Sequence, residues 1–131
     1  MKGIEKSAEE NGIGRERFEL IETDIFSNIS KKYDYILANP PYVAENRKDE
    51  VGEDVKMFEP AIALYGGSDG MEIIKDFLNK AKDYLKEGGI VYMEFDPKQK
   101  EEIEEIIKGR YSNFEFLKDR YNKYRVVKIE K

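Results

Sequence analysis

The sequence predicts an α/β domain with a mainly parallel sheet whose last strand is reversed. Segments with a helical apolar repeat alternate with short strand-like segments, the pattern of parallel strands joined by crossover helices. The last two strand-like segments are Phe114–Lys118 and Arg125–Ile129. The connection 119–124 between them is too short for a crossover helix, so they must pair antiparallel. At 131 residues, the chain is expected to form a single domain over residues 1–131.

Composition narrows the range of functions. A net charge of -5 disfavours non-specific contact with phosphates, so nucleic acid is not expected as a partner. The chain has no cysteine and no histidine, which excludes disulfides, thiolate metal sites and a histidine base. No metal site is expected. We find neither a signal-peptide core nor an apolar run of membrane-spanning length, and therefore expect a cytoplasmic protein without a membrane partner.

The first third of the chain contains a short helix and two strand-like segments. Residues 2–11 form a polar helical pattern, and Gly12 is a natural stop for it. In Phe18–Glu22, apolar and charged residues alternate well enough to predict a strand. The residues that follow, 23–26, read as a turn, and Tyr33–Ala38 is apolar and aromatic enough to predict a second, buried strand.

Four residues, Asn39-Pro40-Pro41-Tyr42, follow this second strand, and we call them the elbow. The two prolines donate no ladder hydrogen bonds and restrict the residues before them to extended geometry. The predicted result is a stiff segment at the carboxyl end of a strand, where ligands bind in open α/β sheets. Asn39 places a side-chain carbonyl there beside the rigid backbone carbonyl of Pro40, an arrangement suited to a planar nitrogen. The plainer interpretation is an ordinary strand-ending turn.

A loop and a helix follow the elbow. Val43–Ser68 has no convincing periodicity, which is typical of a binding loop, a lid or a disordered segment. Asp69 and Glu72 could form a capping box at the start of the next helix. Gly88-Gly89 would end that helix. Its apolar stripe comprises Ile74, Phe77, Leu78, Ala81, Tyr84 and Leu85.

The last elements before the final strand pair are a strand and a helix. Ile90–Phe95 is predicted to be a buried strand. Asp96-Pro97 has the form of an N-cap followed by proline at the first helical position, and Gly109 would end this helix. Arg125 is interpreted as a structural partner for a carboxylate or carbonyl near the last strands.

Several of these features occur together in one protein family. The chain resembles the HemK family, the S-adenosylmethionine-dependent methyltransferases that modify the glutamine of the release-factor Gly-Gly-Gln motif. Where that family usually has glycine, this chain has Asn122, the residue that best tolerates left-handed backbone after glycine. The matching segments are the elbow, Phe58-Glu59-Pro60, Ala63-Leu64, Gly66-Gly67, Asp69-Gly70, Gly88-Gly89, Gln99 and Asp119–Val127.

The resemblance implies a truncated Rossmann-like methyltransferase fold, with S-adenosylmethionine as cofactor and a peptide-chain release factor as substrate. The chain corresponds to the carboxyl-terminal part of the catalytic domain, without the family's glycine-rich cofactor motif. The family's sheet places the absent strands between Phe18–Glu22 and Tyr33–Ala38, which leaves Tyr33–Ala38 at a hydrophobic edge. We expect that edge to be covered by Phe18–Glu22, by a second copy of the chain in a homodimer, or by a separate subunit.

The resemblance also implies roles for individual residues. Asn39 and the Pro40 carbonyl would be catalytic, by accepting the N–H groups of the substrate carboxamide. The cofactor would contact Asp24, Ile25 and Asn39, although Asp24 can equally be read as a turn aspartate. The substrate would contact Pro41, Tyr42, Phe58, Glu59 and Pro60.

Two alternatives to glutamine methylation are kept open. The Asn-Pro-Pro-Tyr tetrapeptide also occurs in amino-methylating enzymes that act on DNA and RNA, so one alternative is an N6-adenine or other nucleic-acid methyltransferase. The other is a non-catalytic remnant that folds or oligomerises without binding the cofactor.

Overall fold

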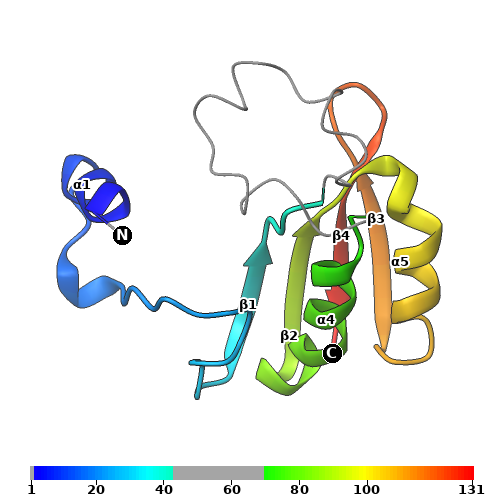
Figure 1. Ribbon diagram of the computed structural model, residues 1–131, viewed down its shortest axis with the longest axis horizontal. Coiled ribbons are helices and arrows are strands. Elements are labelled where there is room, and N and C mark those ends of the chain that lie inside the picture. The colour runs from blue at the N-terminus through cyan, green and yellow to red at the C-terminus, as the bar shows by residue number, and fades with distance from the viewer. Residues whose placement is uncertain (1, 43–69) are drawn as a thin grey trace. The chain divides into compact units, whose positions relative to one another are not determined.

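A computed structural model describes residues 2–42 and 70–131 (Figure 1). The predicted loop Val43–Ser68, Asp69 and the predicted substrate residues Phe58, Glu59 and Pro60 lie outside these ranges. The capping box predicted for Asp69 and Glu72 is wrong, because the next helix begins at Glu72 with Met71 as its N-cap. The chain divides into two compact units, Met1–Ser30 and Lys31–Lys131, and each is described on its own.

The first unit contains a helix, a turn and an extended segment. Helix α1 (Lys2–Glu10) ends two residues before Gly12, whose φ of 67° confirms the predicted stop. A 3-10 turn, η1 (Arg15–Arg17), follows it. The strand prediction for Phe18–Glu22 is wrong, because this segment belongs to none of the strands that the structure describes. An alternating pattern gives an extended chain, but a strand also needs a neighbour to complete its backbone hydrogen bonds.

The second unit is built on a four-stranded sheet in the order β1-β2-β4-β3. Strands β1 and β2 are parallel, whereas β4 runs antiparallel to both β2 and β3. The last strand is therefore the reversed one, as predicted. The bounds are β1 (Tyr33–Ala38), β2 (Leu85–Glu94), β3 (Asn113–Lys118) and β4 (Tyr124–Glu130).

Helices α4 (Glu72–Ala81) and α5 (Lys100–Ile107) pack together against the sheet (Figure 1). An ion pair of 2.7 Å between Lys75 and Glu102 joins them. The apolar stripe predicted for α4 is confirmed as far as Ala81. The fully buried side chains of this core include Ile74, Leu78, Val91, Met93, Ile103, Ile107, Val127 and Ile129.

The end of α4 differs from the prediction. The helix gives way to a 3-10 turn, η3 (Lys82–Tyr84), and Leu85 already belongs to β2. Gly88 and Gly89 lie within β2, where its pairing with β1 is irregular between Tyr33 and Tyr35. With a φ of 72°, Gly88 allows the strand to bulge instead of ending the helix.

The start of α5 agrees with the prediction. Asp96 caps the 3-10 turn η4 (Pro97–Gln99), which leads directly into α5. The side chain of Gln99 completes a capping box with Asp96, a part of the motif that the sequence interpretation missed.

Strand β1 lies at the edge of the sheet, as expected from the resemblance. The prediction that Tyr33–Ala38 is buried is wrong, because none of its residues is buried at this edge. Leu37 is 79% exposed and Tyr35 60% exposed, and both point away from the face that α4 and α5 cover. Because Phe18–Glu22 forms no strand, it does not cover this edge as a paired strand; covering by a second copy or a separate subunit stays a prediction. Among the described residues, no helix has the length and apolarity needed to cross a membrane.

Candidate functional site

The elbow begins where β1 ends, beside the carboxyl end of β2. In the parallel pair, Leu37 lies opposite Tyr92 and Ala38 opposite Met93. The next step along the two chains therefore places Asn39 beside Glu94. Asn39 is exposed, whereas Pro40, Pro41 and Tyr42 are partly buried. The elbow thus presents the Asn39 side chain to solvent from a segment that is anchored behind it.

A hollow of about 300 Å³ adjoins Asn39 on the sheet face that α4 and α5 leave open. Its volume is at the lower end of the range for small-molecule sites. It is mostly apolar, and the side chains with polar groups that line it are those of Asn39, Tyr92 and Glu94. Its lining residues are Leu37, Ala38, Asn39, Tyr92, Glu94 and Val126.

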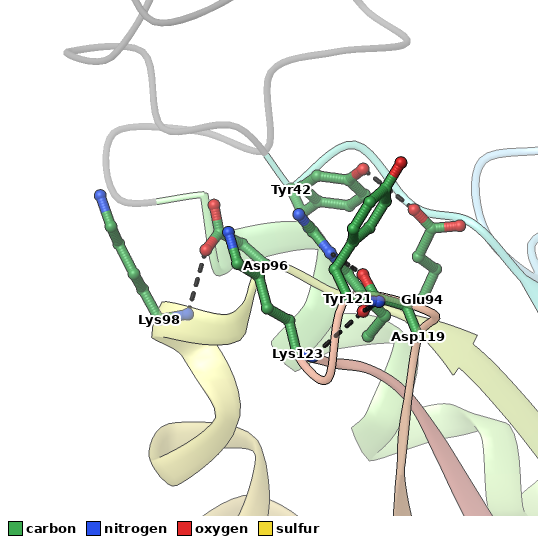
Figure 2. Close-up of polar contacts among 8 residues, drawn as sticks. Tyr42, Glu94, Asp96, Lys98, Asp119, Tyr121 and Lys123 are labelled. Carbon is green, nitrogen blue, oxygen red and sulfur yellow. Dashed lines mark hydrogen bonds and ion pairs between the residues drawn. The ribbon is translucent and has the colours of Figure 1, made fainter.

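Tyr42 is fixed by a hydrogen bond across the site. Its phenol donates to Glu94 Oε1 at 3.1 Å, and Figure 2 shows the two side chains pointing toward each other. Partial burial, followed by the negative charge of Glu94, raises the pKa of Tyr42 above 10.0. The phenol therefore stays protonated and can act as a donor throughout the neutral pH range.

Gln99 connects three backbone segments around the elbow. Its Nε2 donates to the carbonyl oxygens of Tyr42 and Gly70, at 3.0 Å each. Its Oε1 accepts a hydrogen bond of 3.0 Å from the Asp96 amide. The side chain is only 7% exposed, and all of its polar atoms are hydrogen-bonded.

The β3–β4 turn lies at the same end of the sheet as the elbow, because Glu94 pairs with Val126 near the start of β4. Asp119 Oδ1 accepts hydrogen bonds from the Tyr121 and Lys123 amides, at 2.8 and 3.0 Å (Figure 2). These contacts, with the hydrogen bond from the Lys123 amide contributing most, lower the pKa of Asp119 below 3.8. The carboxylate thus shapes the turn.

Two predictions about this turn are confirmed. Asn122 has a φ of 62°, the left-handed conformation expected where the family usually has glycine. The Arg125 guanidinium lies 3.6 Å from the second oxygen of Asp119, so Arg125 is the structural partner of a carboxylate.

The predicted cofactor residues are divided between the two units. Asp24 and Ile25 belong to the first unit, and Asn39 belongs to the second. Asp24 is exposed, and Ile25 has a φ of 53°, which is uncommon for a β-branched side chain. Asn39, Pro40, Pro41 and Tyr42 lie together on one elbow. The roles given to these four residues stay predictions, as do those given to Asp24, Ile25, Phe58, Glu59 and Pro60.

Sequence reasoning gave no role in the site to Glu94 or to Gln99, although Gln99 is one of the residues that match the family. A carboxylate at the end of a strand parallel to β1 was the available signal for Glu94, because neighbouring parallel strands end at the same edge of the sheet. For Gln99, the signal was its position three residues after the Asp96 cap. In residues 2–42 and 70–131, no three carboxylates are grouped closely enough to hold a metal ion.

Known structures share this fold. The ribosomal protein L11 methylase of Lactobacillus delbrueckii subsp. bulgaricus aligns with a TM-score of 0.64 at 22% identity, over 98% of this chain and 51% of its own. TrmN from Thermus thermophilus aligns with a TM-score of 0.58 at 18% identity, over 96% of this chain and 31% of its own. These alignments confirm the Rossmann-like methyltransferase fold.

Curated relatives are more similar in sequence. The release factor glutamine methyltransferase of Streptococcus pneumoniae is 35% identical over 85% of this chain, and that of Koribacter versatilis is 37% identical over 80%. The chain covers only 40% and 38% of these two proteins. It therefore spans less than half the length of these relatives.

A family model also matches most of the chain. The model described as Eco57I restriction-modification methylase matches residues 2–98, which include α1, the elbow, α4 and β2. The relatives above confirm the resemblance to the HemK family, the release factor glutamine methyltransferases. By the match over residues 2–98, the chain belongs to the Eco57I restriction-modification methylase family.

Proposed function

We propose that this chain carries the methyl-acceptor half of an S-adenosylmethionine-dependent protein-glutamine N5-methyltransferase, whose substrate is the glutamine of the release-factor Gly-Gly-Gln motif. The relatives named release factor glutamine methyltransferase support this substrate. The observation that carries the proposal is the position of Asn39, which is exposed on a rigid Pro-Pro elbow at the edge of an apolar hollow.

The residues present fit the cofactor in part. The exposed Asn39 amide and the open hollow beside it could accept a small group, and Asp24 offers an exposed carboxylate for a hydroxyl or amino group. Within the second unit, Asn39 is the residue that would hold the cofactor, while the roles of Asp24 and Ile25 in the first unit stay predictions. S-adenosylmethionine would supply an electrophilic methyl group on a sulfonium sulfur.

The elbow would orient the acceptor nitrogen. Asn39 Oδ1 and the Pro40 carbonyl oxygen would each accept one N–H of the substrate carboxamide, which fixes the nitrogen in one plane. Positioning of this kind is a large part of what such a site can contribute to the rate. As positive charge develops on the nitrogen, the two carbonyl dipoles stabilise it more than they stabilise the ground state. The prolines keep those dipoles in place because their φ angles are fixed.

The test combines ligand binding with methyl transfer. Calorimetric titration of the chain with S-adenosylhomocysteine measures whether it binds the cofactor product, and a labelled-methyl assay then compares a release factor with adenine-containing DNA and RNA. We expect saturable binding and transfer to the release factor. Asn39→Ala should remove transfer while Asn79→Ala, the same change at an exposed position on α4, should not. Full transfer by Asn39→Ala would refute the role of the elbow.

One finding favours a second candidate, methylation of an amino group in nucleic acid. The family model that matches residues 2–98 is described as a restriction-modification methylase. Transfer to DNA or RNA in the same assay, without transfer to the release factor, would establish this candidate in place of the first. If the titration shows no binding, the non-catalytic interpretation holds for the chain by itself.

A further inference from the structure

Gln99 is the only amide or charged side chain that is buried in the part of the chain that the structure describes. The proposed reaction does not use it. A buried amide needs partners for two N–H groups and one oxygen, and Gln99 has all three in the carbonyls of Tyr42 and Gly70 and the amide of Asp96. Its partners come from three separate segments: the end of the elbow, the start of α4 and the corner after β2.

Few other side chains could make this set of contacts. Glutamate would turn an acceptor toward two carbonyl oxygens, and methionine would leave both carbonyls and the Asp96 amide without a partner. Asparagine has the same chemistry but is one methylene shorter. The site therefore requires both the length and the two donors of glutamine.

Tyr42 is held at both of its ends. Its phenol donates to Glu94 Oε1 on β2, and its backbone carbonyl accepts from Gln99 at the start of α5. Between Tyr42 and β1 there are only Asn39 and two prolines, which allow little rotation. Fixing Tyr42 at two points therefore also limits the orientation of the Pro40 carbonyl and the direction in which the Asn39 side chain leaves the backbone.

We propose that Gln99 is a positioning residue for the site, which sets the geometry of the elbow through the Tyr42 carbonyl without itself touching the substrate. This inference rests on the proposed function for its catalytic meaning, but its structural claim can be tested without methyl transfer. The competing explanation is that Gln99 serves only as half of the capping box that begins α5.

The two explanations differ in what they predict for two tyrosines. Tyr42 reports on the elbow. Tyr111 lies four residues after the end of α5, and its phenol donates to the Leu78 carbonyl of α4 at 2.7 Å. Burial raises the pKa of Tyr111 above 10.0. It therefore reports on the packing of α5 against α4. A loss of the elbow alone would expose Tyr42 and leave Tyr111 unchanged.

The experiment is an NMR titration of the whole chain labelled with ¹³C at tyrosine Cζ. Tyr42→Phe and Tyr111→Phe assign the two signals. In Gln99→Met, we expect the pKa of Tyr42 to fall toward its ordinary value while the pKa of Tyr111 stays raised. Glu101→Met, which introduces the same side chain at an exposed position two residues further on, should leave both pKa values as they are in the unsubstituted chain.

Two results would overturn the proposal. If the pKa of Tyr42 in Gln99→Met stays where it is in the unsubstituted chain, Gln99 does not fix the elbow. If the pKa values of both tyrosines fall together, Gln99 supports α5 as a whole and has no specific effect on the elbow. Gln99→Asn keeps the side-chain amide but shortens the side chain by one methylene. It therefore applies the same test if Gln99→Met does not fold. Since no step requires catalysis, failure here is distinct from failure of the proposed function.

Discussion

The hydrogen bond between Tyr42 and Glu94 should stabilise the folded chain by a measurable amount. A bond to a charged acceptor contributes about 1.5–3 kcal/mol when it is short and buried. Here the oxygens are 3.1 Å apart and the pair is only partly buried, so we expect a coupling energy of about 1 kcal/mol between Tyr42→Phe and Glu94→Ala. Urea unfolding of both single variants and the double variant at neutral pH measures this energy.

Alkaline pH gives a second measurement of the same bond. The pKa of Tyr42 is raised in the folded state, so its stabilising effect is complete below about pH 10 and is lost as the pH rises through the folded value. Above pH 10, Tyr42→Phe should therefore lose less stability than the unsubstituted chain. Some alkaline loss of stability remains in both proteins, because the pKa values of Tyr111 and Lys128 are also raised. A coupling energy near zero, or an unchanged alkaline loss in Tyr42→Phe, would refute the reasoning.

Three further predictions concern the core, the turn and the exposed edge. Leu78→Ala removes a fully buried side chain and should lower the free energy of unfolding in urea by about 3 kcal/mol, whereas Asn79→Ala should change it by less than about 0.5. The pKa of Asp119 is lowered in the folded chain, so the ionised carboxylate stabilises the fold above pH 3.8, and this contribution is lost as the pH falls through the folded pKa. In acid unfolding, the stability difference between the unsubstituted chain and Asp119→Asn should therefore shrink over that pH range. If a second copy covers β1, sedimentation should show concentration-dependent association that Leu37→Glu abolishes, and a monomer at all concentrations would contradict this.

Local patterns were sufficient to predict most of the second unit. The apolar run of β1, the stripe of α4 and the proline after Asp96 each describe the element in which they lie. The elbow could be recognised for the same reason, since its stiffness comes from two adjacent prolines and needs no distant partner.

The errors occurred where distant residues decide the structure. Leu85 fits the helical repeat of α4, but pairing with Tyr33 across the sheet places it in β2. Phe18–Glu22 has the alternation of a strand but forms no strand ladder. Gln99 had a local signal as the third residue after a cap, yet its bonds to Tyr42 and Gly70 depend on how three segments meet in space.

The position of β4 in the sheet has a consequence for synthesis of the chain on the ribosome. This strand is the last to be made, yet it lies between β2 and β3 and pairs with both. Until Tyr124–Glu130 has left the ribosome, β3 has no strand beside it, and β2 exposes a full row of backbone hydrogen-bonding groups. The nascent chain must therefore pass through a stage with two open strands, when pairing with other chains competes with correct folding.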